Sequence, residues 1–218
     1  MENQQLIPIK KIVIIGPEST GKSSLCQQLA SHYSTQWVRE FAREYLLANG
    51  TDYRFENLLT IAKGQVESEE REVNRMMQLL SSPVSEKVYT QDDGSTSILP
   101  LFIDTDMYVL KVWCEFVFDK CHFWILNEVV KRQYDLYLLC NVDLPWVKDE
   151  LREYPDLESR ERLYHHYKDI MVNQRIPWVN IYGNYEERLQ RAIAAVDEVC
   201  KLKPSSFPKN IDHTHRNY

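Results

Sequence analysis

The sequence predicts one α/β domain in which a mostly parallel, five-stranded sheet is covered by helices on both faces. Short apolar runs rich in β-branched residues alternate along the chain with longer segments whose apolar residues recur every three or four positions. A glycine-rich turn joins the first apolar run directly to a helical segment. The length of 218 residues, 44% of them hydrophobic, is enough to bury the core of one such domain.

Five short segments have the composition of buried parallel strands, which carry apolar residues on both faces. The first reads IVIIG and ends in glycine. The third begins after Pro100, a residue that a strand tolerates only at its start. We expect strands at residues 12–15, 36–38, 101–104, 136–140 and 178–182.

Apolar residues at helical spacing between these strands predict the covering layers. Asn49-Gly50 closes the second helix and Pro83 ends the long third one. We expect helices at residues 23–32, 41–49, 55–80, 107–118, 123–132, 146–152, 160–173 and 186–202. The polar residues 84–97 should form an exposed loop or a small hairpin. We assign residues 1–203 to the domain, with right-handed crossovers, and residues 204–218 to a flexible tail.

The composition argues against several classes of partner. A formal net charge of −6 and a pI near 5.6 do not favour binding to nucleic acid or to an anionic membrane surface. The five cysteines are scattered and odd in number, as expected of reduced thiols. No apolar run approaches the roughly 20 residues of a membrane span, and MENQQLIPIKK lacks the apolar core of a signal peptide. We therefore expect a cytoplasmic protein that binds neither nucleic acid nor membrane.

The glycine-rich turn carries the main functional motif. Residues 16–23, GPESTGKS, match G-x-x-x-x-G-K-[ST] at every position, between a predicted strand and a predicted helix. In such a loop the backbone N–H groups and the helix N-terminus form a nest for phosphates. Lys22 would neutralise β- and γ-phosphate oxygens, and Ser23 would bind Mg²⁺. The predicted ATP-binding residues are Gly16, Glu18, Ser19, Thr20, Gly21, Lys22, Ser23 and Ser24.

A second acidic position should decide what happens to the bound nucleotide. Asp104 ends the third predicted strand, and Asp106 follows two residues later. A carboxylate at this edge of the sheet can serve Mg²⁺ or can take the proton of an acceptor hydroxyl. An aspartate there can also cap the next helix. We assign the chemistry to Asp104, and for Asp106 both acceptor binding and capping stay open.

Residues after the second predicted strand are candidates for binding the acceptor. The Glu40 carboxylate suits ribose hydroxyls and the Arg43 guanidinium suits an anionic group. Trp37 is an aromatic candidate on the same side. The alternative is that Glu40 and Arg43 belong to the solvated face of a helix.

A charged segment downstream of the fourth predicted strand is typical of a lid. Asp149 and Arg152 precede a turn at Pro155, and Arg160 and Arg162 follow it. An arginine on a closing segment can stabilise charge on a transferring phosphoryl group while water is excluded. We assign this role to Arg152 on a short helical lid, with a charged surface hairpin as the alternative.

These motifs together resemble the ribosylnicotinamide kinase domain of the NadR type, within the P-loop nucleoside and nucleotide kinases. The segments GPESTGKSSL, WVREFAREY, FIDTD, DLYLLCNVDLPWVKDELR and PWVNIYGNYEERLQRA follow one another in the family's order. The resemblance implies a three-layer P-loop NTPase fold of the nucleoside-kinase type. It also implies ATP- and Mg²⁺-dependent phosphorylation of the 5′-hydroxyl of nicotinamide riboside, a step of NAD salvage.

The same resemblance implies roles for individual residues. Asp104 would be the base, Glu40 and Asp106 would hold the acceptor, and Arg152 would belong to the lid. Bifunctional members of the family carry a nucleotidyltransferase domain before the P-loop. Here about ten residues precede the first predicted strand, too few for a domain, so adenylyl transfer is not expected.

Two other functional classes stay open at this point. A regulatory GTPase would keep the phosphate loop, but its guanine-reading N-K-x-D motif is replaced by Asn141-x-Asp143, which lacks the lysine and the spacing. A nucleotide-bound interaction module without turnover would also keep the loop. The presence of Lys22, Ser23 and Asp104 favours turnover over such a module.

Overall fold

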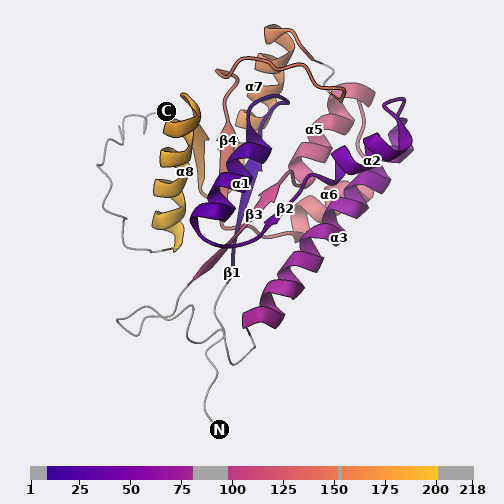
Figure 1. The fold of residues 1–218 in the computed structure, drawn as a ribbon. Helices are drawn as coiled ribbons and strands as arrows, with labels where there is room; N and C mark the ends of the chain where they lie inside the picture. Colours follow the sequence, from indigo (N-terminus) through magenta and orange to yellow (C-terminus); the bar gives the residue numbers. More distant parts are fainter. Residues whose placement is uncertain (1–8, 81–97, 152–153, 201–218) are drawn as a thin grey trace, which may run out of the picture.

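The computed structural model describes residues 9–80, 98–151 and 154–200. Its centre is a five-stranded sheet in the order β2-β3-β1-β4-β5, and every neighbouring pair of strands is parallel (Figure 1). The strands are β1 (Ile9–Ile15), β2 (Trp37–Val38), β3 (Leu99–Asp104), β4 (Leu136–Cys140) and β5 (Trp178–Ile181). All five predicted strands are present, and the predicted α/β class is confirmed.

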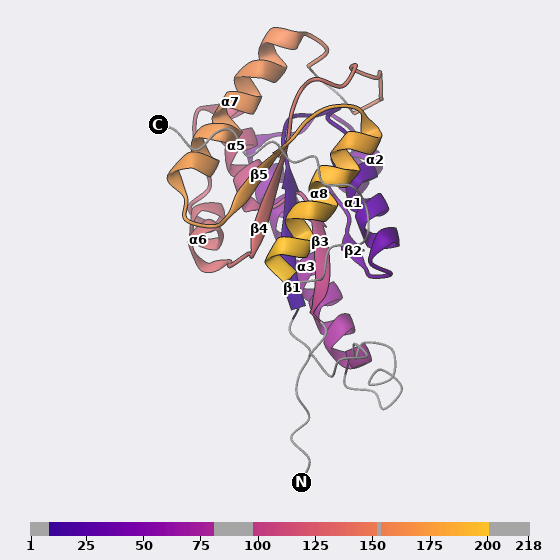
Figure 2. The same cartoon turned by 90° about the vertical axis from the view of Figure 1, so that its left-hand side faces the viewer.

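Helices cover both faces of this sheet, which makes three layers. The helices are α1 (Lys22–His32), α2 (Phe41–Asn49), α3 (Phe55–Leu80), α5 (Met107–Phe118), α6 (Phe123–Lys131), α7 (Leu157–Asn173) and α8 (Tyr185–Cys200). α1 and α8 pack on one face, and α3, α5 and α7 pack on the other (Figures 1 and 2). In β1, Ile12 and Ile14 face the first layer whereas Val13 and Ile15 face the second, because side chains alternate along a strand.

α2 and α6 lie outside these layers. α2 packs against α3, and α6 packs against α5, around a third buried cluster that includes Ala42, Leu58 and Ile125. This arrangement places the N-terminus of α2 beside the carboxyl end of β3. The carboxyl ends of β1, β3 and β4 lie at the same edge of the sheet, because these three strands are parallel and adjacent. Ligands of such sheets bind at this edge.

The prediction of a helix at residues 146–152 is wrong for residues 146–151, the part of this segment that the structure describes. Residues 146–151 contain no helix. The N–H of Val147 donates to the Ser19 hydroxyl oxygen at 2.9 Å, and the N–H of Leu151 donates to the Asp149 carboxylate at 3.1 Å. These side-chain acceptors replace the helical backbone ladder, so the segment runs across the loop that contains Ser19.

Several other expectations concern the ends of elements and the rest of the chain. α7 begins at Leu157, three residues before its predicted start, because the Asp156 carboxylate accepts a hydrogen bond from the N–H of Ser159 at 2.7 Å. All five cysteines are free. No helix in the described part of the chain is long and apolar enough to cross a bilayer. The predicted loop at residues 84–97 and the predicted tail at residues 204–218 lie outside the described residues.

Candidate active site

Two glycines shape the turn between β1 and α1. Gly16 has a φ of 138°, and a Cβ atom there would lie 2.7 Å from the carbonyl oxygen of Cys140 on the neighbouring strand. Gly21 is the N-cap of α1 and has a φ of 78°, in the left-handed region that favours glycine. The chain can therefore leave the central strand close to β4 and enter α1 within a few residues.

The loop between these glycines has the features of a phosphate nest. The first N–H groups of α1 have no intrahelical acceptors and carry the positive end of the helix dipole. The Thr20 hydroxyl and the Lys22 ammonium both donate to the carbonyl oxygen of Pro17, at 2.7 and 2.9 Å. Lys22 is therefore folded over the loop, where its charge and the backbone N–H groups would meet the same anion.

A cavity of about 230 Å³ opens beside this loop. The loop, residues 16–24, forms one wall, and Glu40 and Arg43 of the α2 region form another. The remaining wall is apolar and aromatic and comes mainly from α5 and α7. Its residues include Val109, Trp113, Phe116, Val117, Tyr154, Leu163 and Tyr167. The cavity thus joins a phosphate nest to a surface on which a planar base can pack.

Asp104 is buried next to this cavity and is not part of its lining. The residue is 1% exposed, and neither carboxylate oxygen accepts a hydrogen bond from any residue that the structure describes. Burial and the nearby Glu40 charge raise the pKa of Asp104 well above its usual range, whereas Lys22 and the Ser23 hydroxyl act to lower it. A buried carboxylate with both oxygens unsatisfied beside a serine hydroxyl fits a divalent cation as its missing partner.

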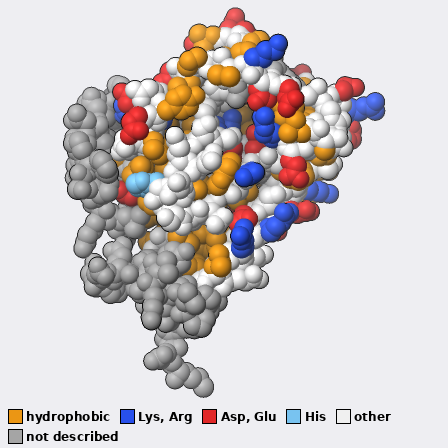
Figure 3. All heavy atoms as spheres, viewed as in Figure 1, with side chains coloured by type: hydrophobic (Ala, Val, Ile, Leu, Met, Phe, Trp, Pro, Cys, Tyr) orange, Lys and Arg blue, Asp and Glu red, His pale blue; other side chains and the backbone are white. Residues whose placement is uncertain are grey.

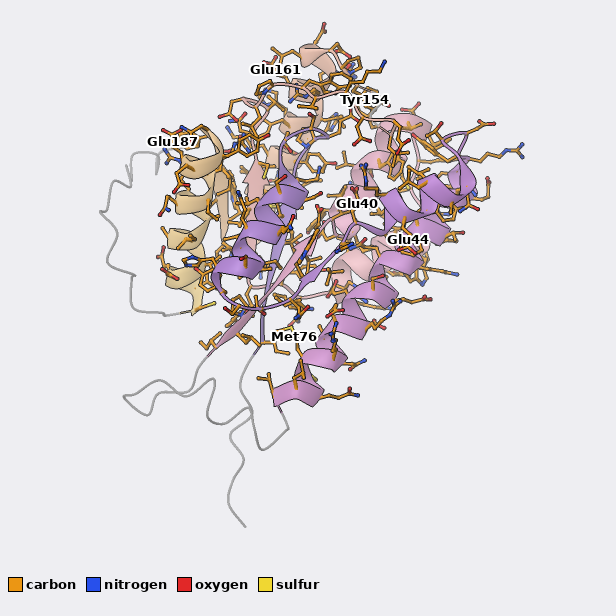
Figure 4. The ribbon with its side chains drawn as sticks, viewed as in Figure 1. Glu40, Glu44, Met76, Tyr154, Glu161 and Glu187 are labelled. Atoms are coloured by element: carbon orange, nitrogen blue, oxygen red, sulfur yellow. The ribbon has the colours of Figure 1, made fainter. Side chains whose placement is uncertain are left out.

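Glu40 is the carboxylate that reaches the cavity surface. It is the N-cap residue of α2, yet its side chain makes no capping hydrogen bond. Instead, one of its oxygens accepts a hydrogen bond from the Thr105 hydroxyl at 3.4 Å. Figure 4 shows Glu40 at the start of α2, with Tyr154 above it in this view. Two carboxylates, Glu40 and Asp104, therefore lie together at the edge of the sheet, one facing the cavity and one behind it.

Residues 146–151, which we call the cover segment, cross the phosphate loop. Side chains of the loop accept hydrogen bonds from this segment and from Tyr154, which follows it. The Glu18 carboxylate accepts hydrogen bonds from the N–H of Tyr154 at 2.7 Å and from the Trp146 indole at 3.3 Å. At the other side, Arg43 of α2 forms an ion pair with Asp149 at 3.0 Å. Basic and acidic side chains lie close together over α2 and α3 on the face drawn in Figure 3. The cover segment is thus tied both to the loop and to α2.

Comparison with known proteins places this geometry in a family. A family model described as an AAA domain matches residues 11–188. The chain belongs to this AAA domain family. Two curated relatives, each named "Trifunctional NAD biosynthesis/regulator protein NadR", come from Salmonella typhimurium and Escherichia coli. Each is 24% identical to this chain over 196 residues. The aligned part covers 88% of this chain and 43% of the relative, so the chain spans less than half the length of these relatives.

Solved structures share the fold of this AAA domain. The structure titled "Crystal structure of NadR protein in complex with NR" has a TM-score of 0.68 at 21% identity and covers 94% of this chain. A NadR structure in complex with NAD and AMP-PNP has a TM-score of 0.62 at 20% identity, and this chain spans 53% of each NadR chain. A thymidylate kinase from Ehrlichia chaffeensis has a TM-score of 0.57 at 13% identity, covering 87% of this chain and 99% of its own. These matches confirm the predicted NadR-type resemblance and the P-loop kinase fold.

The structure places Asp106 away from the cavity of this AAA domain. Its carboxylate caps α5 by accepting hydrogen bonds from the N–H groups of Tyr108 and Val109, at 3.0 and 3.3 Å. The other oxygen accepts a hydrogen bond from the Tyr137 hydroxyl at 2.8 Å. The intervening Thr105 has a φ of 79° and turns the chain between the two aspartates. The capping alternative therefore describes Asp106, and we do not include it in the proposed site.

Three other predicted residues are not brought to the cavity. Trp37 packs with the cluster under α1 and α8, with the Arg39 guanidinium 5.5 Å from its ring centroid. Arg160 is 3% exposed and donates to the carbonyl oxygens of Val142 and Leu144, which follow β4, so it is not a mobile lid residue. Arg162 lies over the ring of Phe116, a lining residue, at 5.5 Å. Arg152 lies outside the described residues and stays a prediction.

Sequence reasoning missed Arg188, a buried arginine of α8. It donates hydrogen bonds to the carbonyl oxygens of Thr20, Asn141 and Gly183, at 2.8 to 2.9 Å, and pairs with the Asp143 carboxylate. Arg188 thus ties the phosphate loop to the ends of β4 and β5. Asp143, which the GTPase alternative would need for binding guanine, is therefore already paired with Arg188. An isolated arginine in an amphipathic helix carries no sequence signal for this role.

The sequence also provides no indication that the aromatic wall of the cavity belongs to the site. In the sequence, Trp113 and Phe116 belong to an apolar stripe at helical spacing, which predicts ordinary core packing. In the structure this stripe borders the cavity, so these rings are only partly buried. Only the placement of α5 against α2 and α7 distinguishes a lining aromatic residue from a core one.

Proposed function

We propose that this chain is an ATP-dependent kinase that transfers a phosphoryl group to the 5′-hydroxyl of a small nucleoside, with nicotinamide riboside as the first candidate. The observation that carries the proposal is the pairing of a phosphate nest with a buried, unsatisfied carboxylate and a lined cavity. A binding module without turnover could also use Asp104 to hold Mg²⁺, so turnover is proposed from the second carboxylate, Glu40, which lines the cavity.

The loop and its neighbours would hold the phosphates. Backbone N–H groups of residues 18–24 and the Lys22 ammonium would bind β- and γ-phosphate oxygens. Ser23 and Asp104 are the residues that would hold Mg²⁺, and the unsatisfied oxygens of Asp104 beside Ser23 fit that role. The ion neutralises charge on the phosphates when it is bound.

Glu40 is the carboxylate placed to act on the acceptor, because it lines the cavity and Asp104 does not. In the proposed step the acceptor hydroxyl gives its proton to Glu40 as its oxygen forms a bond to the γ-phosphorus of ATP. The bond from that phosphorus to the bridging oxygen breaks, and ADP leaves. The cover segment excludes water from the cavity, which limits transfer to water.

The choice of nucleoside rests on the aromatic wall and on the relatives. Trp113 and Phe116 offer ring surfaces for a planar base, and the nearby acidic pair favours a base that carries positive charge, as the pyridinium of nicotinamide riboside does. The curated relatives are named for NAD biosynthesis, and one similar NadR structure contains NR.

A nucleoside panel tests the proposal directly. The protein is incubated with ATP, Mg²⁺ and each of nicotinamide riboside, thymidine, uridine, cytidine and adenosine, and the phosphorylated product and ADP are quantified. We expect nicotinamide riboside to give the mononucleotide and to stimulate ADP release well above basal hydrolysis. Equal ADP release with and without every nucleoside would contradict the kinase assignment. GTP in place of ATP tests the GTPase alternative in the same assay.

Three variants separate the proposed roles. Lys22→Ala should abolish transfer and weaken ATP binding, because it removes the charge that faces the phosphates. Glu40→Gln should keep ATP binding but lower kcat by about 10²-fold or more, as expected for loss of a general base. Asp104→Asn should raise the Mg²⁺ concentration needed for half-maximal activity. If Glu40→Gln retained full kcat while Asp104→Asn lost it without any change in Mg²⁺ dependence, Asp104 would be the base.

A further inference from the structure

Gln65, a buried residue in the middle of α3, lies beneath the two carboxylates of the site. It is 2% exposed and belongs to a helix that neither carries the phosphate loop nor contributes a residue to the lining of the cavity. A polar side chain in such a position needs partners for both ends of its amide. The partners of Gln65 are backbone groups of the two segments that bear Glu40 and Asp104.

One end of the Gln65 amide anchors the start of α2. Its Oε1 accepts a hydrogen bond from the N–H of Phe41 at 2.7 Å. Phe41 is the first residue of α2, and its N–H has no acceptor within the helix. The N-cap residue Glu40 makes no side-chain capping bond, so Gln65 supplies an acceptor from another helix. This contact fixes the backbone next to Glu40.

The other end anchors the end of β3. The Nε2 of Gln65 donates to the carbonyl oxygen of Asp104 at 3.3 Å. Asp104 is the last residue of the strand, so this carbonyl lies where the sheet ladder stops. A single planar amide therefore spans the backbone points from which the Glu40 and Asp104 side chains project.

The residue before Gln65 sets the distance between the helices. A Cβ atom on Gly64 would lie 2.2 Å from the ring of Phe41, so glycine allows this close approach of α2 to α3 with the ring in place, and a larger residue would force the ring to move. The approach is needed for Gln65 to reach the Phe41 N–H. Gly64 and Gln65 thus have complementary roles. Gly64 leaves room for the ring of Phe41, and the amide of Gln65 binds the Phe41 N–H.

We infer that Gln65 is a positioning residue that sets the spacing of Glu40 and Asp104 at the edge of the cavity. The two carboxylates share one edge of the sheet, where like charges repel each other, so a fixed backbone is needed to hold them together. The structural part of this inference stands on the hydrogen bonds. Its catalytic consequence rests on the proposed kinase activity.

The chemistry of the amide explains which substitutions should fail. Methionine has a similar length but leaves the Phe41 N–H and the Asp104 carbonyl without this partner. Glutamate keeps an acceptor for Phe41 but cannot donate to the Asp104 carbonyl when ionised, and it adds a third charge beside Glu40 and Asp104. Glutamine is the one residue of this length with both an acceptor and a donor in one plane.

The test compares Gln65→Met and Gln65→Glu with Met76→Ala, a control on the same helix. Met76 is 1% exposed and lies at the other end of α3 (Figure 4), so its truncation lowers stability without touching the site. Amide hydrogen exchange is followed by NMR, and kcat and KM are measured for ATP and for the nucleoside. Chemical denaturation of each variant shows whether the stability losses are comparable.

We expect the Phe41 amide to exchange about tenfold faster in Gln65→Met, and no more than global destabilisation requires in Met76→Ala. We expect kcat to fall by 10- to 100-fold in both Gln65 variants, with KM for ATP within about twofold of wild type, because the phosphate loop is unchanged. Unchanged Phe41 exchange in Gln65→Met, or a kcat equal to that of Met76→Ala at matched stability, would overturn the inference. A wild-type protein that phosphorylates no nucleoside would refute the proposed function, and the exchange result would still decide whether Gln65 positions the pair.

Discussion

Four residues around the cavity, Gly16, Ser19, Gly21 and Thr105, have positive φ angles of 138°, 57°, 78° and 79°. Such conformations cost about 1–3 kcal/mol for residues other than glycine and persist where surrounding contacts determine them. Thr105 is held by a hydrogen bond from its N–H to the carbonyl oxygen of Ile14 and by the contact of its hydroxyl with Glu40. The strain is therefore located between the phosphate loop and the acidic pair, where the backbone must turn sharply.

Replacing Gly16 should affect both the stability of the protein and its binding of ATP. Gly16→Ala should lower the free energy of unfolding by about 3 kcal/mol, because the new methyl group would meet the Cys140 carbonyl and the φ of 138° disfavours alanine. ATP binding should be lost as well. Gly50→Ala is the control, since Gly50 also has a positive φ but has open space around its Cα. Chemical denaturation and nucleotide titration measure both variants, and equal losses would show that contact with β4 is unimportant.

A second prediction concerns the pH dependence of stability through Asp106. Burial raises the pKa of Asp106 from 3.8 to about 7, although hydrogen bonds from Tyr137, Val109 and Tyr108 act to lower it. Between these values the folded state binds more protons than the unfolded state, so the free energy of unfolding should fall as pH rises from about 4 to 7. Asp106→Asn should flatten this fall, and Tyr137→Phe should extend it to higher pH. Denaturation at several pH values checks the sign, and a steeper fall in Asp106→Asn would contradict it.

At the scale of elements, the cover segment and α2 close the cavity from opposite sides. Arg43 and Asp149 join them through an ion pair whose arginine side chain is 49% exposed. An exposed ion pair contributes little to global stability, typically below about 1 kcal/mol. Its effect should therefore be local, on how often the cover segment leaves the phosphate loop.

Asp149→Asn should speed exchange of the Val147 amide several-fold while changing the free energy of unfolding by less than about 1 kcal/mol. The asparagine can still accept the hydrogen bond from Leu151, so the substitution is directed at the ion pair with Arg43. Glu115→Gln, which breaks the surface pair with Lys111 on α5, is the control. Hydrogen exchange with mass spectrometry compares the two, and identical exchange in the cover segment would show that the ion pair does not hold it.

At the scale of the whole molecule, Arg188 connects α8 to a loop at the other end of the sequence. Its bond to Thr20 joins residues 168 positions apart, and its remaining partners lie after β4 and β5. Arg188→Met would leave these carbonyls without their arginine donor and would remove the ion pair with Asp143, which would keep only the hydrogen bond from the Gly183 N–H among those described, so we expect a loss of about 3 kcal/mol in stability. KM for ATP should rise more than KM for the nucleoside. Lys131→Met, at an exposed position of α6, is the control, and equal rises in both KM values would contradict a role for Arg188 in holding the phosphate loop.

The fold was largely predictable because its signals are local. Buried strands show as short β-branched runs, and covering helices show as apolar residues at three- and four-residue steps, so most bounds agree with the structure to within two residues. The helix predicted at residues 146–152 failed because the local pattern suited a helix, while side chains of two distant residues bind this segment: Ser19 accepts from the N–H of Val147 and Glu18 accepts from the Trp146 indole. Tertiary hydrogen bonds decided its conformation.

By itself, the sequence determined the α/β class, the phosphate loop and the candidates Lys22, Ser23, Asp104 and Glu40, because each depends on residues that are adjacent or at regular spacing. The contacts of the folded chain were needed to show that Asp106 caps a helix, that Glu40 lines the cavity while Asp104 does not, and that Gln65 and Arg188 support the site. Those roles depend on which distant segments the parallel sheet brings to one edge. Spacing along the chain carries no information about such contacts.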